Sequence, residues 1–375
     1  MKKKLLLSIF VSSSLFANIE TDFFKETQKL DRELTNINNT KSKMDIINPL
    51  NFTYSNDFET KNEYYSISFS QDIFRSGGIF HSISYSNKIK HLDLKHLDLK
   101  QQNNLLDTYI LVKRIQLLDL NIEKTKLNLK NKEIEYKTKN ELYRNGLTDI
   151  FTVNDLVISI ESLQNSLIDL EISKKDIVNT LKSMTHVKYM NVMINHLPFP
   201  NEKEFLDNNI SNLDKLNIQA LHKQKDLINT NYMPKISLYG SSTEYLNSNN
   251  PTYNSIGIRL SMGLHPNIYY NNEVSKLKIL KSKLSLNEKI VNMKNLYNFN
   301  KEKLSLLNKK EDNLNTIIKT LDKKLESIQQ DIDLGNTTQY TFDILNNTKK
   351  QYEIDKVKLK IEKDILILSL RKNMI

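Results

Sequence analysis

Residues 65–78 read Tyr65-Ser66-Ile67-Ser68-Phe69-Ser70-Gln71-Asp72-Ile73-Phe74-Arg75-Ser76-Gly77-Gly78, and two structural periods meet in them. The first half alternates apolar and small polar residues, which predicts a β-strand with one apolar face. The glycine pair is followed by residues 79–145, a stretch of 67 residues that contains no glycine and no proline. As one helix this stretch would span about 100 Å. The segment therefore predicts a strand that runs directly into a very long helix.

Three other segments share the alternation of the strand. The clearest covers residues 256–264, and residues 52–55 and 236–239 look like partners for the two alternating strands. We predict four strands in two hairpins, over about residues 50–58, 62–74, 234–245 and 252–264. One face of these strands is apolar, with Tyr65, Ile67, Phe69, Ile256, Ile258 and Leu260, and the other is small or polar, with Ser66, Ser68, Ser70, Arg259 and Ser261.

The composition favours long elements over a loop-rich fold. Only 7 glycines and 6 prolines occur in 375 residues, although together they average about 12 % of proteins and mark turns and helix ends. No cysteine is present, which excludes disulfides, thiolate metal sites and a cysteine nucleophile. Lysines and arginines are dispersed among acidic residues, so the formal net charge of +10 does not indicate a nucleic-acid partner.

The N-terminus has the pattern of an export signal. Three lysines precede an apolar run from Leu5 to Val11, and small residues follow up to Ala17. We predict a signal peptide over residues 1–17, whose removal lowers the formal net charge from +10 to +7. No other segment approaches the roughly 20 apolar residues of a transmembrane helix. The chain is thus expected to be periplasmic, secreted, or inserted in an outer membrane as β-strands.

The chain is built from two similar halves. Ser70 and Ser261 hold matching strand positions 191 residues apart, and Gly146 and Gly335 end long helical stretches 189 residues apart. A repeat of this length indicates a duplicated half-protein, with halves at 18–197 and 198–375. Heptads of apolar residues fill the stretches between the glycines and prolines and are typical of coiled coils. The expected helices are one before Pro49, then 79–145, 151–190, 209–231, 268–334 and 340–373.

Four strands are too few to close a barrel. A half-buried sheet on a soluble core would show the same alternation, but the export signal and the strand lengths favour a membrane. The open edges of a four-stranded sheet cannot lie in lipid, because backbone groups there need partners. Several copies must therefore share one barrel, and three copies give 12 strands.

Several motifs resemble those of TolC-like outer-membrane efflux proteins. Residues 65–78 are similar to the strand-to-helix element of that family, with Gln-x-hydrophobic-Phe and a glycine pair. Residues 231–240 resemble its third strand, and residues 144–156 and 334–346 resemble its two periplasmic helix–turn–helix tips. The chain departs from the family at residues 262–267, which lack the glycine pair, and in the second tip, where the aspartate comes two residues later.

The resemblance implies a mainly α-helical fold with a small membrane β-barrel. Three chains would form a 12-stranded barrel in the outer membrane of a Gram-negative bacterium, continuous with a coiled-coil helical barrel in the periplasm. It also implies a gate of aspartate rings at the lower end, here with Asp343, Asn346 and Asp155, the last beside Thr152. Adaptor docking is implied for the tips, at Asn145, Gly146, Leu147, Thr148, Gly335, Asn336 and Thr337.

Each of these residues also has a purely structural interpretation. Asp343 can stabilise a helix start through the macrodipole, and Gly146 and Gly335 can act as helix C-caps. His91 and His96 belong to the repeated pentapeptide His-Leu-Asp-Leu-Lys, but histidines five apart lie on different helix faces, so we expect no metal site. No motif for catalysis, phosphate binding or a cofactor was found.

The leading hypothesis is an exit duct of a tripartite efflux pump or type I secretion system. Its expected partners are two further copies of the chain, outer-membrane lipid, a periplasmic adaptor, and a proton-driven or ATP-driven inner-membrane transporter. An alternative is an exported trimeric coiled-coil adhesin or structural stalk, which would share the heptads but has no need of strand pairs in mid-chain. A third interpretation, the adaptor itself, would require a lipoyl-like β domain that is not evident.

Overall fold

The structure of the chain, a computed structural model, describes residues 22–57, 59, 62–185, 197–211, 213–246, 251–263 and 266–373. The expected signal peptide at 1–17 lies outside these residues. The chain divides into two compact units. We call Thr27–Lys100 with Asp207–Asn292 the sheet unit, and Gln101–Leu206 with Met293–Ile375 and the N-terminal residues up to Glu26 the tip unit.

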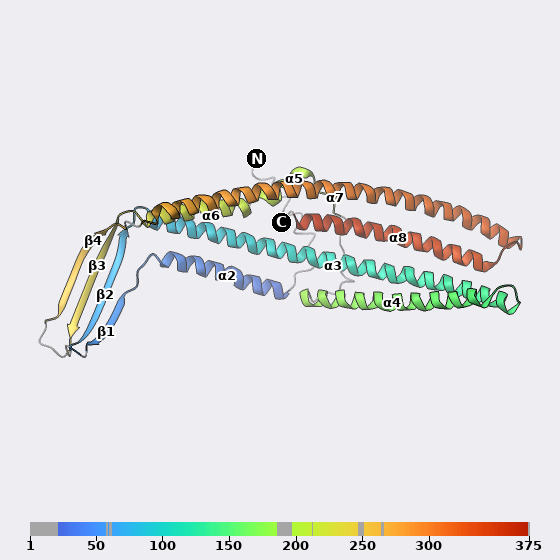
Figure 1. Cartoon of the computed structure of the whole chain (residues 1–375), viewed down its shortest axis with the longest axis horizontal. Helices are drawn as coiled ribbons and strands as arrows, with labels where there is room; N and C mark the ends of the chain where they lie inside the picture. Colours follow the sequence, from blue (N-terminus) through green and yellow to red (C-terminus); the bar gives the residue numbers. More distant parts are fainter. Residues whose placement is uncertain are drawn as a thin grey trace. The chain divides into compact units, whose positions relative to one another are not determined.

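The sheet unit contains one antiparallel sheet of four strands in the order β1-β2-β3-β4 (Figure 1). The hairpins β1–β2 and β3–β4 are joined by pairing between β2 and β3. The last β3–β4 pair is Lys235 with Ser261, because the preceding Pro234 has no N–H to donate. The expected strand over 252–264 is therefore shorter at its end. The strands are β1 Asn51–Asp57, β2 Asn62–Phe74, β3 Lys235–Tyr245 and β4 Tyr253–Ser261.

Polar contacts order the helices of the sheet unit. Asn39 of α2 (Asp22–Met44) donates to Ser86 of α3 (Gly78–Arg144) over 2.7 Å. Lys88 of α3 donates to Gln219 of α6 (Leu213–Thr230) over 2.9 Å. Asp214 of α6 pairs with Lys289 of α7 (Ile268–Asp333) at 2.8 Å. The order across the unit is therefore α2, α3, α6, α7, with α2 and α7 at its edges.

The expected helix at 209–231 is wrong at its start. The structure has two helices here, α5 (Glu202–Ser211) and α6. Asn201 begins α5 by accepting a hydrogen bond from the backbone N–H of Glu204 at 2.7 Å, which is a normal N-cap contact. Helix α5 ends at Ser211 and α6 begins at Leu213.

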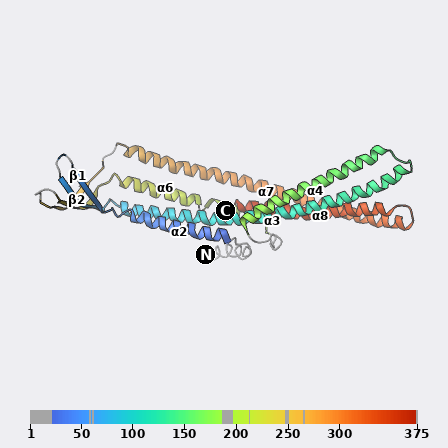
Figure 2. The same cartoon turned by 90° about the horizontal axis from the view of Figure 1, so that it is seen from below.

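Long helical segments of the tip unit pair as antiparallel hairpins (Figure 2). Asp119 of α3 pairs with Lys174 of α4 (Ile150–Met184) at 2.5 Å. Glu311 of α7 pairs with Lys363 of α8 (Gln339–Lys372) at 2.5 Å. Contacts between α3 and α8, described below, join the two hairpins, so the order is α4, α3, α8, α7.

Helix α4 ends earlier than the expected boundary at residue 190. Thr185 follows its last residue and takes an extended backbone with φ −154° and ψ 147°. Its N–H donates to the carbonyl of Leu181, and its side chain is buried. Residues 186–196 lie outside the described part of the chain.

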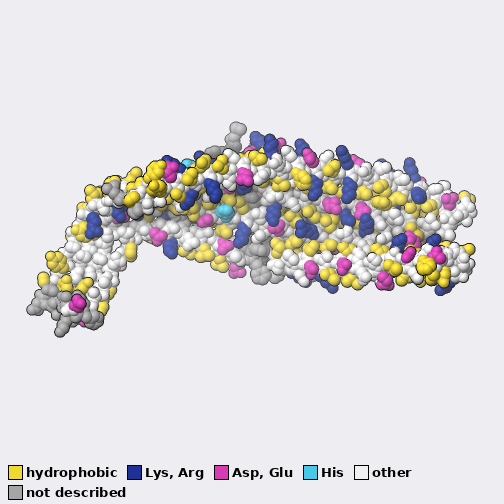
Figure 3. All heavy atoms as spheres, viewed as in Figure 1, with side chains coloured by type: hydrophobic (Ala, Val, Ile, Leu, Met, Phe, Trp, Pro, Cys, Tyr) yellow, Lys and Arg dark blue, Asp and Glu magenta, His cyan; other side chains and the backbone are white. Residues whose placement is uncertain are grey.

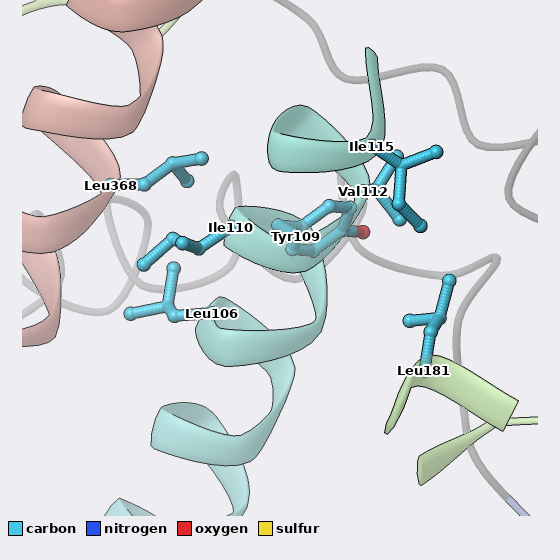
Figure 4. Packing of buried hydrophobic residues seen from close by; sticks show 7 residues of the cluster. All are labelled: Leu106, Tyr109, Ile110, Val112, Ile115, Leu181 and Leu368. Carbon is cyan, nitrogen blue, oxygen red and sulfur yellow. The ribbon is translucent and has the colours of Figure 1, made fainter. Parts of the chain in front are cut away.

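The main buried cluster lies where α4 and α8 end against the middle of α3 (Figure 4). Leu106 and Ile110 of α3 point toward Leu368 of α8, and Leu181 of α4 lies on another side of α3. Burial raises the pKa of Tyr109, a member of the cluster, to about 12. The cluster is small, so burial here fixes one level of the unit rather than its whole length. In the described part of the chain, no helix is long and apolar enough to cross a membrane.

The two hairpin turns have the same backbone. Gly146 and Gly335 both have positive φ, 71° and 74°. The N–H of Gly146 donates to Tyr143, and that of Leu147 to Leu142; Gly335 and Asn336 make the equivalent bonds to Ile332 and Asp331. These paired bonds define a Schellman C-cap. The expectation that both glycines cap long helices is thus met in their geometry.

Replacing Gly146 or Gly335 with alanine tests this turn. We expect each change to destabilise the local turn by about 1 kcal/mol, because a Cβ is unfavourable at positive φ, and asparagine to cost less. Amide hydrogen exchange over the last turns of α3 and α7 measures the effect. Gly263→Ala is the control, since a Cβ there meets only one atom at 3.9 Å and its φ is not positive. Equal exchange in Gly146→Ala and Gly263→Ala would contradict the assignment.

Candidate functional site

The strand register sorts the predicted residues onto two faces of the sheet. Directly paired residues of antiparallel strands share a face. On β3, Ser66 pairs with Thr243, Ser68 with Ser241 and Ser70 with Tyr239. Alternate residues of a strand share a face, so Ser237 and Lys235 lie on the same side of β3, and they pair with Arg259 and Ser261 of β4. The five predicted small or polar residues therefore lie on one face. We call this the polar face and the opposite one the apolar face.

Side-chain hydrogen bonds cross the polar face. Ser237 donates to Asp72 over 2.6 Å, and Thr243 donates to Ser66 over 3.3 Å. The hydroxyls of Ser241 and Ser255 lie 2.8 Å apart. Each bond joins neighbouring strands, so the face is held by a regular set of short polar contacts. Sequence analysis did not single out Asp72 or Ser237, although the strand period places both on this face.

The apolar face is exposed in the single chain. Ile256, Ile258 and Leu260 are 78 %, 71 % and 73 % exposed. On β2, Tyr65 and Ile67 are also exposed, and Phe69 is half-buried. The ring of Tyr65 lies 5.8 Å from that of Phe52 and 5.3 Å from that of Tyr54, both on β1. No helix of the described chain covers these isoleucines, which is unusual for a soluble sheet.

The helix tips present exposed apolar side chains next to the two glycines. Leu147 is 71 % exposed and Leu334 is 73 % exposed, and Phe151 in the first turn of α4 is 75 % exposed. The other predicted docking residues, Asn145, Thr148, Asn336 and Thr337, lie in the same two turns. Both tips lie at the same end of the tip unit (Figure 1). Each tip therefore combines an exposed turn with exposed apolar side chains.

Asp149, which was not among the predicted site residues, caps the helix that follows the first tip. Its Oδ1 accepts from the backbone N–H of Thr152 at 2.7 Å and from the Thr152 hydroxyl at 3.1 Å. These bonds to the carboxylate lower the pKa of Asp149. The sequence carried a signal for this role, because aspartate followed three residues later by a polar residue commonly begins a helix.

The predicted gate residues are placed apart in two groups. Asp343 and Asn346 lie one turn apart on α8, both half-buried, and Asp343 accepts from the Gln339 amide at 3.2 Å. Asp155 is exposed on α4. It lines an open hollow of about 440 Å³ between α3, α4 and the first turn of α8, together with Thr152, Tyr340 and Thr341. Neither Asp343 nor Asn346 is among the described residues that line this hollow.

Polar contacts between α3 and α8 were not predicted from the sequence. Asp107 pairs with Lys372 at 2.7 Å, and Lys124 with Asp355 at 2.6 Å. Between them, Lys113 pairs with Asp364 at 2.8 Å. The positions rise by 17 along α3 while they fall by 17 along α8, so one antiparallel register holds throughout.

The same register continues toward the tips through a buried amide pair. Asn347 donates to the side-chain oxygen of Asn131 over 2.8 Å, and both residues are about 5 % exposed. Across the visible face, hydrophobic, acidic and basic side chains alternate along the helices (Figure 3). A polar contact between particular residues is therefore hard to distinguish from surface charge in the sequence alone.

Metal-ligating side chains do not gather in the described residues. No group of three or more histidine and acidic residues there has a geometry that would hold a metal ion. His91 and His96 are both exposed on α3.

Comparisons with known proteins rest on structure alone. No family model matches the sequence, and no curated protein is similar to it in sequence. The fold is similar to that of CusC, a protein whose crystal structures concern folding and transmembrane channel formation. The TM-score is 0.72 and the sequence identity 12 %, over 96 % of this chain and 91 % of CusC. The Campylobacter jejuni outer membrane channel CmeC matches with a TM-score of 0.72 and 12 % identity, over 96 % and 84 %. The outer membrane protein VceC of Vibrio cholerae matches with a TM-score of 0.67 and 11 % identity, over 92 % and 91 %.

The fold is similar to that of outer-membrane channel proteins such as CmeC. A mainly helical chain with one small antiparallel sheet is shared with CusC, CmeC and VceC over almost the full length. The resemblance to TolC-like outer-membrane efflux proteins is therefore confirmed at the level of the fold.

The Asp149 cap predicts a pH dependence of the first tip. A lowered folded-state pKa means that the carboxylate stabilises the fold above its unfolded pKa of about 3.9, and that this contribution is lost as the pH falls through the folded pKa. Asp149→Ala should destabilise the start of α4 at pH 7, and its difference from the parent should shrink as the pH falls below about 4. Hydrogen exchange and thermal unfolding between about pH 7 and pH 2 measure the change. Asn154→Ala, on the exposed side of α4, is the control; the same pH profile in both variants would contradict the role of Asp149.

Proposed function

We propose that three copies of this chain form an outer-membrane exit duct of a tripartite efflux pump or type I secretion system. The observation that carries the proposal is the sheet, with an exposed apolar face, a polar face and two outer strands that each pair on one side only. The fold shared with CusC, CmeC and VceC supports it. The duct conducts passively and carries out no chemistry.

In the proposed barrel, β4 of one copy pairs with β1 of the next. Three four-stranded sheets then give 12 strands with no free edge, which satisfies every backbone group in lipid. Tyr65, Ile67, Phe69, Ile256, Ile258 and Leu260 face lipid. Ser66, Ser68, Ser70, Arg259 and Ser261 face the water-filled lumen.

Exposed apolar stripes on the edge helices support the contact between copies. On α2, Leu30, Leu34 and Ile37 are each 56 % exposed and follow the four-three spacing of a heptad. On α7, exposed apolar residues recur every seven positions at Tyr270, Leu277, Leu284 and Val291. Both helices are at edges of the sheet unit, so each lacks a neighbour on one side within the described chain. A second copy would cover both stripes.

The tips are the proposed contact with a periplasmic adaptor, which links the duct to a proton-driven or ATP-driven inner-membrane transporter. Exposed Leu147, Phe151 and Leu334 supply apolar contact area around the two glycine turns. The energy for transport comes from the transporter. Near the tips, Asp343 with Asn346 on α8 and Asp155 on α4 form the proposed gate, where three copies of each carboxylate would favour cations.

The proposed trimer predicts the effect of a charge on the α7 stripe. Leu277→Glu should abolish heat-resistant trimers in outer-membrane fractions, because it places a carboxylate in the covered interface. Lys278→Glu, at the next exposed position of α7, is the control and should leave the trimers intact. A soluble or shed protein would contradict the duct and favour the exported coiled-coil stalk.

The proposed gate predicts cation block. In single-channel recordings from planar bilayers, Gd³⁺ added on the tip side should block the parent channel, and Asp343→Asn should weaken the block at least about tenfold, because a ring of three charges is removed. Asp333→Asn, an exposed acid at the end of α7, is the control. Unchanged block by Gd³⁺ in Asp343→Asn would remove Asp343 from the gate.

A further inference from the structure

Two cationic side chains share the polar face near the helical end of the sheet. Lys235 is the first residue of β3, and Arg259 is two residues before the end of β4. In the register, Lys235 pairs with Ser261 and Arg259 with Ser237, so both cations project from the same face. Both are exposed. Of these two, only Arg259 was among the predicted site residues.

A tyrosine holds Arg259 in place on this face. The Arg259 guanidinium lies 4.8 Å from the centre of the Tyr239 ring, a distance typical of a cation–π contact. Gly257 makes room for that ring, because a Cβ at residue 257 would lie 2.7 Å from the Tyr239 hydroxyl oxygen. The positive charge is therefore fixed against the sheet rather than spread over many rotamers, and a guanidinium stays charged at any working pH.

The nearby acid does not neutralise these cations. Asp72 is on the same face, but its carboxylate accepts from Ser237 at 2.6 Å and pairs with Arg75 at 3.4 Å. The Asp72 side chain is only 13 % exposed. Among the described residues, neither Lys235 nor Arg259 makes an ion pair. The exposed charge at this end of the polar face is therefore positive.

We propose that Lys235 and Arg259 make the lumen of the duct selective for anionic solutes. This inference rests on the proposed function, because three copies of the polar face would place six cations around one water-filled opening. Such a ring raises the local concentration of anions and repels cations within about one Debye length, 30 Å at 0.01 M salt and 3 Å at 1 M. The solutes favoured are those that carry carboxylate, phosphate or sulfate groups.

The test is the ratio of chloride to potassium permeability, from reversal potentials in planar bilayers. The background is Asp343→Asn, so that the proposed tip charge does not contribute. In low salt this channel should prefer chloride, and Lys235→Gln with Arg259→Gln should lower the ratio by about twofold or more. The effect should disappear near 1 M KCl. Lys203→Gln removes one exposed charge from α5 and is the control for charge at a site off the sheet.

Arg259→Lys separates charge from packing, since it keeps the charge and loses the flat stacking on Tyr239. It should retain the chloride preference. Two results would overturn the inference while leaving the duct intact. One is a permeability ratio in the double variant equal to that of Lys203→Gln, and the other is a fall in the ratio in Arg259→Lys as large as in the double variant. Absence of any conductance from the parent protein would instead contradict the duct, and the selectivity with it.

Discussion

Within the described sheet, β1 pairs only with β2 and β4 only with β3, so each outer strand carries a row of backbone groups along one edge. In water such an edge binds solvent, but in lipid each unpaired group costs several kcal/mol. The apolar face makes a second, independent requirement, because Ile256, Ile258 and Leu260 are more than two-thirds exposed. In the proposed trimer, strand pairing between copies would meet the first requirement, and surrounding lipid would meet the second.

The tip unit depends on register more than on the area that it buries. Its main cluster occupies one level of α3, whereas the polar contacts from Asp107 to Asn131 hold α8 in one alignment along several turns. A buried ion pair such as Lys113 with Asp364 adds little net stability, since desolvation offsets the attraction. A shift of one helix past the other would leave both charges without partners. The contacts therefore specify an alignment that leucine heptads alone leave open.

Local periods explain what the sequence could predict. Alternation around Ile67 and Ile258 placed the correct residues on each face, because side-chain direction in a strand depends only on the position along it. The long helices followed from the absence of glycine and proline, and the two turns from Gly146 and Gly335. The N-caps of α5 at Asn201 and of α4 at Asp149 also have local sequence signals, but neither cap was predicted. Tertiary contacts have no such local signal in the sequence. Asn131 pairs with Asn347, which is 216 residues away, and α4 ends before Thr185, and both features depend on the residues that pack beside them.

The two tips have the same backbone turn but differ in how the following helix is capped. Both tips have the same Schellman turn and then begin a helix three residues after the glycine, at Asp149 and at Thr338. Asp149 accepts a hydrogen bond from the first turn of α4, whereas Thr338 makes no side-chain cap bond to α8. Without a side-chain cap, the N–H of Thr341 in this turn has only a backbone bond, to the carbonyl of Thr338 at 3.1 Å, and such a turn opens more readily than a capped one. The first turn of α8, which leads to Asp343, is therefore the less stable of two otherwise matching helix starts. A movement that changes the position of Asp343 has a lower local cost than the equivalent movement at Asp155.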